Sequence, residues 1–419
     1  MSEVTWEITS LSELGTFSRG KSKHRPRNDA RLFEGGKYPL VQTGDVKAAN
    51  LYITKNDSYY NDFGLKQSKL WPAGTLCITI AANIAETAIL SYPMCFPDSI
   101  VGFNANPEKS SELFVYYFFE YIKKEIQKSA SGSIQDNINI DYLSKMRIKV
   151  PEKDYQDKIV EVLSSIDKKI LLNNQINQEL EDMAKTLYDY WFVQFDFPDQ
   201  NGKPYKSSGG KMVYNPELKR EIPEGWGVDS LWNIANFYNG LAMQKYRPDT
   251  NEDDYLPVIK IREMMNGFSK DTEKARLDIP TEAVVERGDI LFSWSATLEV
   301  IIWGKERGAL NQHIFKVTSD TYPKSFIYFE LKSYLKVFKA IAELRKTTMG
   351  HITQDHLKQA KIVVPPIEII SKLDAKLQLI MLKQQILENQ NQELTQLRDW
   401  LLPMLMNGQV YKRIEGKND

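Results

Sequence analysis

An internal repeat constrains this chain more than any other feature of its sequence. The string Asn177-Gln-Glu-Leu180 returns 214 residues later as Asn391-Gln-Glu-Leu394. In the same ungapped frame, Ile148-Lys-Val-Pro151 returns as Ile362-Val-Val-Pro365. Self-similarity at a fixed offset is the sequence signature of a repeated structural unit, so these matches indicate a duplicated segment.

The beginnings of the two copies also match, but at a shift of 220 residues. The paired positions are Trp6, Ser10, Leu11, Phe17 and Gly20 in the first copy, and Trp226, Ser230, Leu231, Phe237 and Gly240 in the second. The changed offset places insertions and deletions in the middle of each copy. Similar ends with diverged middles are what two copies of one scaffold show if each must bind something different.

A heptad pattern follows each Val-Pro. Apolar residues recur in alternating steps of four and three, at Ile159, Leu163, Ile166, Ile170, Leu180, Ala184, Leu187 and Trp191, and in the copy at Leu373, Leu377, Ile380, Leu387, Leu394, Leu401 and Leu405. This spacing is typical of the a and d positions of a coiled coil. Each copy therefore predicts a helix of about 35–40 residues, roughly 55 Å long. Two equivalent helices pack most simply as an antiparallel coiled coil about a pseudo-two-fold axis.

Polar residues interrupt the apolar positions near the middle of both helices, at Asn173, Asn177, Gln384 and Asn391. Polar groups at such positions cost stability but fix the register of the pair. We assign Asn173, Asn177 and Asn391 to register, and expect Asn177 and Asn391 to lie near the axis. The alternative is that these side chains face solvent on slightly shifted helices.

The rest of the chain predicts mixed α/β modules. Short β-type runs lie at Tyr38–Val41, Thr75–Ile80 and Arg147–Val150, with helices at Leu113–Lys128 and Phe326–Leu344 and a turn plus strand at Val285–Phe292. We expect mixed α/β (or α+β) modules at 1–150 and 226–366 and long helices at 151–195 and 367–410. Residues 196–225, rich in Gly, Pro, Ser and Asn, are expected to form an irregular linker.

The charge is segregated along the chain, so the net charge of −1 says little about any one surface. A basic segment contains Arg19, Lys21, Lys23, Arg25, Arg27 and Arg31 with one acid, Asp29. Its counterpart contains Lys245, Arg247, Lys260 and Arg262, with Glu252, Asp253 and Asp254 nearby. Such side chains neutralise phosphates, and Arg can pair with guanine. A charge run is more often only a solvated surface, but its recurrence in both copies favours DNA contact.

The candidate DNA-binding set therefore has thirteen members. They are Arg19, Lys21, Lys23, Arg25, Arg27, Thr43, Lys47, Lys245, Arg247, Lys260, Arg262, Ser293 and Ser295.

No motif predicts catalysis. Gly15–Ser22 fits the P-loop pattern G-x-x-x-x-G-K-[ST], but the required buried strand before it and helix after it are not predicted. His351 and His356 are five residues apart, which does not place them on one helix face, so no metal site is expected. Neither an Asn-Pro-Pro-aromatic methyltransferase motif nor a G-x-S-x-G elbow occurs. We expect a non-enzymatic chain without a cofactor of its own.

The expected location is the cytoplasm. The N-terminal residues have no signal-peptide pattern, and no apolar run reaches the roughly 18 residues that a bilayer crossing needs. Cys77 and Cys95 have no metal-type spacing and are expected to be reduced.

The chain resembles, over essentially its whole length, the specificity subunit of type I restriction–modification enzymes. The strings that carry the resemblance are Gly288–Ser295 (GDILFSWS), Ala309–Val317 (ALNQHIFKV), Ile148–Pro151, Tyr190–Phe192 and Gly202–Gly210 (GKPYKSSGG). The first copy departs from this pattern, because Gly74-Thr-Leu-Cys-Ile-Thr-Ile80 replaces the Gly-Asp-Ile form. We expect it to belong to another branch of the module and to read a different sequence.

The resemblance implies a non-catalytic subunit that reads double-stranded DNA. Each recognition domain would read one half of a bipartite, asymmetric site, and the two helices would set the gap between the halves. Two methyltransferase (modification) subunits with S-adenosylmethionine would dock on this chain, and two motor–endonuclease (restriction) subunits that use ATP and Mg would join them. Two alternatives are a coiled-coil scaffold whose modules bind protein partners and a stand-alone enzyme.

Overall fold

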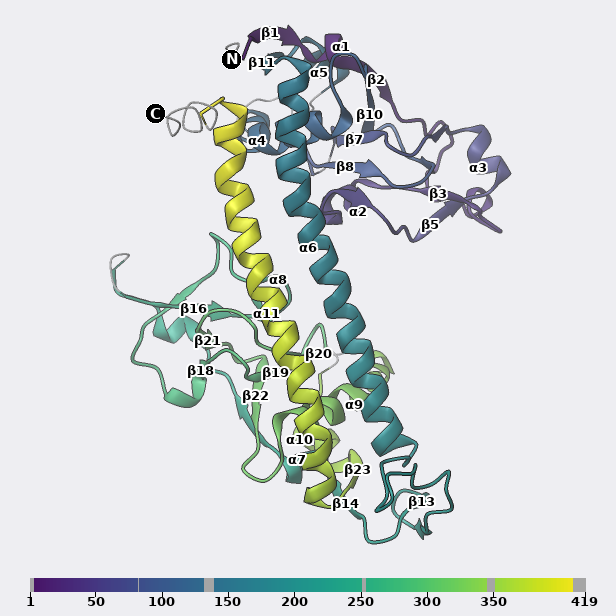
Figure 1. The fold of residues 1–419 in the computed structure, drawn as a ribbon, viewed down its shortest axis with the longest axis vertical. Coiled ribbons are helices and arrows are strands. Elements are labelled where there is room, and N and C mark those ends of the chain that lie inside the picture. The colour runs from purple at the N-terminus through teal and green to yellow at the C-terminus, as the bar shows by residue number, and fades with distance from the viewer. Residues whose placement is uncertain (1–3, 82, 132–138, 251–253, 345–350, 410–419) are drawn as a thin grey trace. The chain divides into compact units, whose positions relative to one another are not determined.

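The computed structural model describes residues 4–81, 83–131, 139–250, 254–344 and 351–409. The chain divides into two compact units (Figure 1). The first unit is Met1–Leu172 with Asn391–Asp419, and the second is Asn173–Gln390. Two long helices, α6 (Lys153–Tyr188) and α11 (Ile367–Met406), each contribute one part to each unit. We call the α/β part of each unit its module.

The first module contains three sheets. β1 (Trp6–Ser10) pairs antiparallel with β11 (Arg147–Pro151). A five-stranded sheet has the order β2-β10-β7-β8-β4, with β2 Gly15–Arg19, β10 Ile100–Ala105, β7 Leu76–Thr79, β8 Thr87–Leu90 and β4 Tyr52–Ile53. A four-stranded sheet has the order β5-β3-β9-β6, with β5 Ser58–Tyr60, β3 Tyr38–Leu40, β9 Met94–Cys95 and β6 Leu70–Trp71. Its helices are α1 Leu11–Leu14, η1 Ala30–Leu32, α2 Thr43–Ala48, α3 Asp62–Lys66, α4 Glu112–Ser131 and α5 Ile140–Lys145.

The second module repeats this plan. β14 (Gly227–Ser230) pairs with β23 (Lys361–Val364). One sheet has the order β15-β22-β19-β20, with β15 Asn236–Asn239, β22 Ile314–Thr318, β19 Ile290–Ser293 and β20 Glu299–Ile302. The other has the order β17-β16-β21-β18, with β17 Lys274–Ala275, β16 Leu256–Ile259, β21 Gly308–Leu310 and β18 Val284–Val285. Its helices are α7 Leu231–Ile234, η3 Met243–Tyr246, α8 Ile261–Asn266, η4 Thr281–Ala283, α9 Lys324–Leu344 and α10 Gln354–Gln359.

The two modules have the same topology although their sequences have diverged. The order β2-β10-β7-β8 matches β15-β22-β19-β20, and all neighbours in both are antiparallel. In the smaller sheets, β3 pairs parallel with β9 just as β16 pairs parallel with β21. The repeat therefore covers the diverged middles as well as the similar ends.

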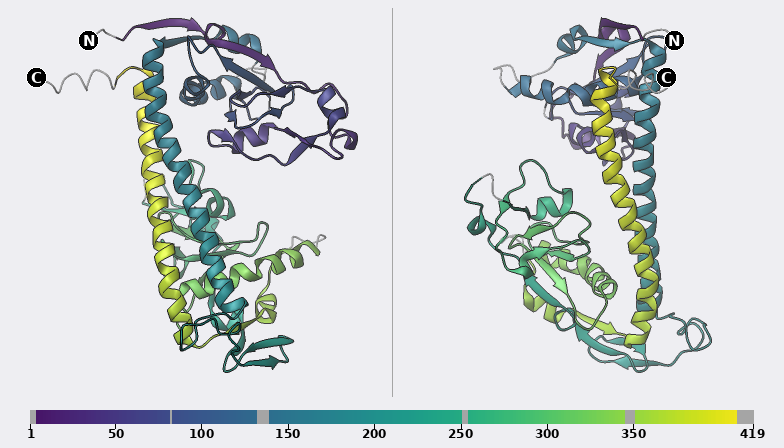
Figure 2. Two further views of the ribbon diagram at one scale, coloured as in Figure 1. Left: turned by 45° about the vertical axis from the view of Figure 1, so that its right-hand side comes forward. Right: turned by 60° about the vertical axis from the view of Figure 1, so that its left-hand side comes forward.

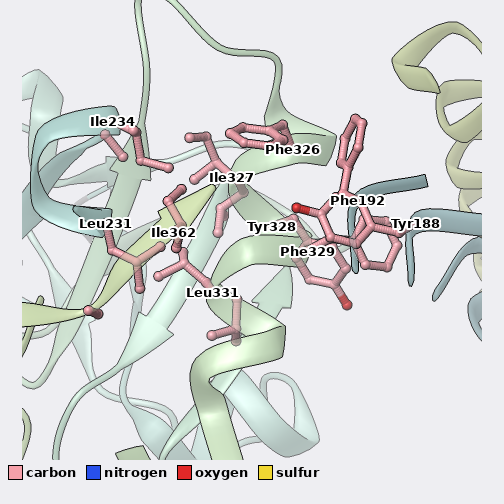
Figure 3. Close-up of a cluster of buried hydrophobic side chains, with 14 of the residues drawn as sticks. Tyr188, Phe192, Leu231, Ile234, Phe326, Ile327, Tyr328, Phe329, Leu331 and Ile362 are labelled. Atoms are coloured by element: carbon pink, nitrogen blue, oxygen red, sulfur yellow. The ribbon is translucent and has the colours of Figure 1, made fainter. Parts of the chain in front are cut away.

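One amphipathic helix covers the core of each module. On α4, Val115, Phe119 and Ile126 recur at helical spacing and are almost completely buried. On α9, the corresponding face presents Ile327, Leu331, Leu335 and Phe338, which are also buried. A stripe of this kind buries one face of a helix against a sheet and leaves the other face to solvent. Figure 3 shows part of the second core, in which residues of α9 meet Leu231, Ile234 and Ile362 on one side and Tyr188 and Phe192 on the other.

Within each unit the parts of α6 and α11 lie side by side (Figure 2). In the second unit, Asn173 contacts Gln390 and Glu181 contacts Gln384, so the helices run antiparallel. The predicted apolar positions Ile159, Leu163 and Ala184, and in the copy Leu373, Leu377, Ile380, Leu387 and Leu405, are buried. The predicted fold class, two repeated α/β modules with two long antiparallel helices, is confirmed.

The segment between α6 and the second module is more ordered than its composition predicts. After the π-turn η2 (Asp189–Val193), it contains a hairpin of β12 (Met212–Asn215) and β13 (Arg220–Pro223). Phe197 stacks on both Tyr205 and Trp226, which lies in the core of the second module. The expectation of an irregular linker is corrected here, because its aromatic residues supply a core that Gly and Ser content does not reveal.

The P-loop-like string lies in a strand. Gly15–Arg19 is β2, whose backbone pairs with β10, so these amides bind a neighbouring strand instead of surrounding a phosphate. The next residue, Gly20, has to be glycine, because a Cβ at this position would lie 2.1 Å from the Pro97 carbonyl oxygen. His356, one of the two histidines considered for metal binding, instead accepts at Nδ1 from the Thr353 amide at the start of α10.

Among the described residues, no helix combines the length and apolar character that crossing a membrane requires. Cys77 and Cys95 are both buried free thiols, and burial raises their pKa values, that of Cys95 to about 11.

Candidate nucleic-acid interface

The basic segment of the first module is attached to the turn between β9 and β10. Lys21 donates its backbone N–H to the Phe96 carbonyl, at 3.1 Å. Asp98, in the same turn, collects three arginines: Arg27 at 2.5 Å, Arg25 at 3.7 Å and, through its backbone carbonyl, Arg19 at 2.6 Å. One carboxylate cannot neutralise three guanidinium groups, so this surface keeps a positive charge.

The other cations of the segment differ in their partners. Lys21 and Lys23 are exposed, and neither forms an ion pair with any residue that the structure describes. Arg31 instead pairs with Asp29 at 2.7 Å. The Arg31 and His24 hydrogen bonds lower the pKa of Asp29, which keeps this carboxylate ionised. Lys21 and Lys23 are therefore the cations most available to a phosphate.

A hollow of about 320 Å³ lies beside the basic segment. Its lining brings Arg27 and Thr43, which are sixteen residues apart in sequence, to one place, together with Ala81 of the β7–β8 turn. Lys47, at the end of α2, donates to Asn83 Oδ1 of the same turn at 3.2 Å. In the first module, four predicted residues (Arg25, Arg27, Thr43 and Lys47) thus gather around two turns at one end of the large sheet.

The cations of the second module are more strongly neutralised. Lys260 and Arg247 both pair with Glu273, at 2.5 and 3.9 Å. The Lys260 hydrogen bond lowers the pKa of Glu273. Arg262 binds Glu263 at 2.6 Å, and only 1% of that glutamate side chain is exposed. Of the four predicted cations, Lys245 alone is exposed and without an ion pair to a described residue.

The two predicted serines have different environments. Ser293 is completely buried, and its hydroxyl donates to the Thr297 carbonyl at 2.5 Å and accepts from the Glu299 amide at 2.9 Å. It shapes the turn after β19 and is not itself exposed to a ligand. Ser295 lies in that turn, half-buried, and forms an isolated β-bridge with His351.

The structure gives the register asparagines partners that the heptad pattern did not identify. Asn173 is fully buried, and its amide donates to Gln390 Oε1 at 3.5 Å. The backbone carbonyl of Asn177, rather than its side chain, accepts from Gln384 Nε2 at 3.3 Å. Asn391 is half-buried, and its carbonyl accepts from Thr395 within α11. Heptad spacing identifies the polar positions, but the crossing of two real helices decides which of them meet.

Comparison with known proteins assigns the family. Residues 3–182 and 223–396 match the model of the type I restriction modification DNA specificity domain. The chain belongs to this family. The two matched segments follow the duplication found in the sequence and in the topology.

Relatives and a solved structure agree with this family. The MjaIX specificity subunit of Methanocaldococcus jannaschii is 26% identical over 97% of this chain and 93% of its own length. The HindI specificity subunit of Haemophilus influenzae is 25% identical over 92% and 97%. The S subunit of a type I restriction–modification system from M. genitalium has the same fold, with a TM-score of 0.55 and 16% identity over 97% of both chains. This chain is thus a DNA specificity subunit, the non-catalytic component of its system.

Sequence reasoning missed several residues of the candidate interface. Asp98 binds three arginines, but it is far from them in sequence and belongs to no motif. Asn83 lies in the β7–β8 turn and Trp294 in the corresponding β19–β20 turn, but the sequences of the two modules do not align in these turns. The one signal available was the hydroxyl residue that precedes both turns, Thr79 in one copy and Ser293 in the other.

Proposed function

We propose that this specificity subunit reads a bipartite, asymmetric DNA site, with one half read by each module. The observation that carries the proposal is that one topology occurs twice on two antiparallel helices in a family of DNA specificity domains. Identical topology provides two equivalent readers, whereas different surfaces provide two different half-sites. The first module offers exposed Lys21 and Lys23 beside Arg25 and Arg27, and the second offers fewer free cations.

The long helices would set the distance between the half-sites. A helix of 36 residues and one of 40 residues extend about 54 and 60 Å at 1.5 Å per residue. This length covers more than one turn of B-DNA, so a fixed helix register would fix the number of unread base pairs. Asn173 and Asn177, with Gln390 and Gln384 opposite, would keep that register.

The helices also carry exposed apolar residues in equivalent pairs. Leu172 and Leu397 in the first unit correspond through the 214-residue repeat to Ile386 and Met183 in the second. Each of the four is between 42% and 53% exposed. Repeated apolar surface of this kind suits two copies of one partner. We assign these positions to two modification subunits, which would supply S-adenosylmethionine chemistry in the cytoplasm, with two restriction subunits and their ATP and Mg joining afterwards.

Methylation mapping tests the proposal. Co-expression of this chain with its modification partners in a host that lacks other methyltransferases should methylate adenines in one bipartite motif. Replacing residues 1–150 with the same part of a relative should change one half-site and leave the other unchanged. A genome without a bipartite motif, or a change in both half-sites, would contradict the two-reader proposal.

A further inference from the structure

The same antiparallel hairpin occupies the same place in both modules. β7 and β8 pair from Leu76↔Ile89 to Ile78↔Thr87, and β19 and β20 pair from Ile290↔Ile302 to Ser293↔Glu299. On one side, the first hairpin pairs with β10, which in turn pairs with β2. In the same way, the second hairpin pairs with β22, which in turn pairs with β15. The two turns are therefore structurally equivalent even though their sequences share no motif.

A buried hydroxyl closes the first of these turns. Thr79 Oγ1 donates to the Asn83 carbonyl and accepts from the Glu86 amide at 3.0 Å. The Thr79 backbone completes the closure, because its N–H donates to the Glu86 carbonyl and its carbonyl accepts from the Ala85 amide, both at 3.0 Å. The residue is completely buried. A buried polar group bonded in this way fixes the backbone around it.

Ser293 closes the second turn in the same manner. Its hydroxyl donates to the Thr297 carbonyl at 2.5 Å and accepts from the Glu299 amide at 2.9 Å. In both turns the donor bond goes to a carbonyl four residues ahead, and the accepted bond comes from the first residue of the returning strand or its neighbour. Two modules that differ in sequence have thus kept one device for shaping this turn.

Both turns contain strained backbone. Asn83 and Ala85 have φ values of 47° and 61°, and Ala296 has a φ value of 55°. Residues other than glycine adopt this left-handed region at a cost, and they do so mainly where surrounding contacts enforce it. The hydroxyl bonds of Thr79 and Ser293 supply such contacts, since they end on the carbonyls of Asn83 and Thr297.

The first turn lies among residues assigned to DNA contact, and the second turn itself contains the assigned Ser295 and follows the assigned Ser293. In the first module, Asn83 accepts a hydrogen bond from Lys47, and Ala81 lines the hollow that holds Arg27 and Thr43. In the second, the indole of Trp294 packs 5.5 Å from the ring of His313 and donates to Asn239. Amide, hydroxyl and aromatic side chains of this kind can contact base edges in a groove.

We propose that Asn83 and Ile84 in the first module, and Trp294, Ser295 and Ala296 in the second, contact bases in their respective half-sites. Thr79 and Ser293 are then positioning residues that hold these turns in the reading conformation. This inference rests on the proposed function. It adds that the β7–β8 turn and the β19–β20 turn are the parts of the two modules that read the bases. It also explains why the hydroxyl persists where the turn residues have diverged: the scaffold of the turn is shared, and the displayed side chains are not.

Substitutions that remove only the hydroxyl test the positioning role. The assembled complex with modification subunits is used to methylate a library in which both half-sites are randomised. Thr79→Val keeps the side-chain volume and removes the hydroxyl. It should relax base discrimination about tenfold in the half-site that is read by residues 1–150, and should leave the other half-site unchanged. Thr79→Ser, which keeps the hydroxyl, should retain the wild-type motif. Ser293→Ala and Ser293→Thr form the mirror experiment on the second half-site.

The reading role has a separate test that does not disturb the core. Asn83→Ala changes a side chain at the tip of the turn, and should alter the preference at one or two positions of the first half-site only. If Thr79→Val does not fold, this variant alone decides the proposal. An unchanged motif with Asn83→Ala, or relaxation of both half-sites with Thr79→Val, would overturn it. A wild-type complex that methylates no bipartite motif would instead contradict the proposed function itself.

Discussion

Arg398 of α11 and Asp167 of α6 form an ion pair of 3.0 Å inside the first unit. Tyr117 of α4 donates to the other oxygen of the same carboxylate at 2.6 Å, so Asp167 joins the module to both helices. The second unit has a similar junction, in which no ion pair is formed by the residues that the structure describes. There Tyr328 of α9 donates to Glu181 at 2.8 Å, and Gln384 of α11 approaches it at 3.4 Å.

The Asp167 junction should contribute to the stability of the first unit. Only 11% of the Asp167 side chain is exposed, so Arg398→Met leaves a largely buried carboxylate with Tyr117 alone. Breaking such a pair costs several kcal/mol when fully buried, and we expect about 2 kcal/mol here because Arg398 is 30% exposed. The midpoint of thermal unfolding should fall by roughly 6 °C.

A surface pair provides the control. Lys145 and Asp141 form an ion pair in which both side chains are more than three-quarters exposed, so Lys145→Met should change the midpoint by less than about 1 °C. Equal effects of Arg398→Met and Lys145→Met would show that burial does not strengthen the Asp167 junction.

Glu330 should make the stability of the second unit depend on pH. It lies buried beside Tyr188, which donates to it, and the positive charge of Arg220 also acts on it. Burial raises its pKa from 4.5 to about 7 despite these two groups. Between pH 4.5 and 7 the folded chain holds a proton that the unfolded chain has lost, so stability falls as pH rises. The loss is complete above about pH 7 and can reach about 3 kcal/mol.

Glu330→Gln should remove this dependence, because the amide still accepts from Tyr188 and does not ionise. When thermal unfolding is measured between pH 5 and 8, the midpoint of the variant should rise relative to that of the wild type as the pH increases. Parallel pH profiles for the two proteins would mean that Glu330 is already ionised in the folded chain at pH 5.

The large pattern of this fold could be predicted from sequence, but the contacts that give it function could not. Heptad spacing located Ile159 and Leu163 on a buried helix face, and the β-type run Thr75–Ile80 located β7. These signals are local and periodic. Ser293 was predicted to contact DNA, whereas its hydroxyl is buried beneath a turn. Its exposure depends on the strand that pairs with β19, and no local pattern contains that information.

The same limit applies to charge. Lys260 and Lys21 look alike in sequence, but Lys260 meets Glu273, which lies thirteen residues further along the chain, whereas Lys21 meets no described acid. The pairing of Lys260 and Arg247 with Glu273 likewise depends on how β16 and β17 come together. A basic residue predicts DNA contact only when its acidic neighbours in space are known, and sequence gives only its neighbours along the chain.

The salt dependence of DNA binding should separate these two kinds of cation. With the assembled complex, Lys21→Ala combined with Lys23→Ala should lower the slope of log K against log salt concentration by about 1.8, because each phosphate contact contributes about 0.9. Arg262→Ala should lower it by less than about 0.3, since Glu263 already neutralises this guanidinium. A larger slope change for Arg262→Ala than for the lysine pair would contradict the assignment of the basic segment to the phosphate backbone.

Asn173 and Gln390 provide the test of helix register. Asn173 is fully buried and donates to Gln390, so a polar contact occupies a position that the heptad pattern would fill with apolar side chains. Replacing both with Leu should raise the unfolding midpoint by a few degrees, because an apolar side chain at the buried position 173 packs there without the desolvation cost of an amide. It should also loosen register, seen as methylation of sites whose gap is one base pair longer or shorter. Leu at the nearby exposed Gln175 should leave both the midpoint and the gap unchanged. A double variant that is more stable yet keeps one gap length would assign the register to packing of the apolar positions, and would leave Asn173 without the role that the sequence pattern predicts.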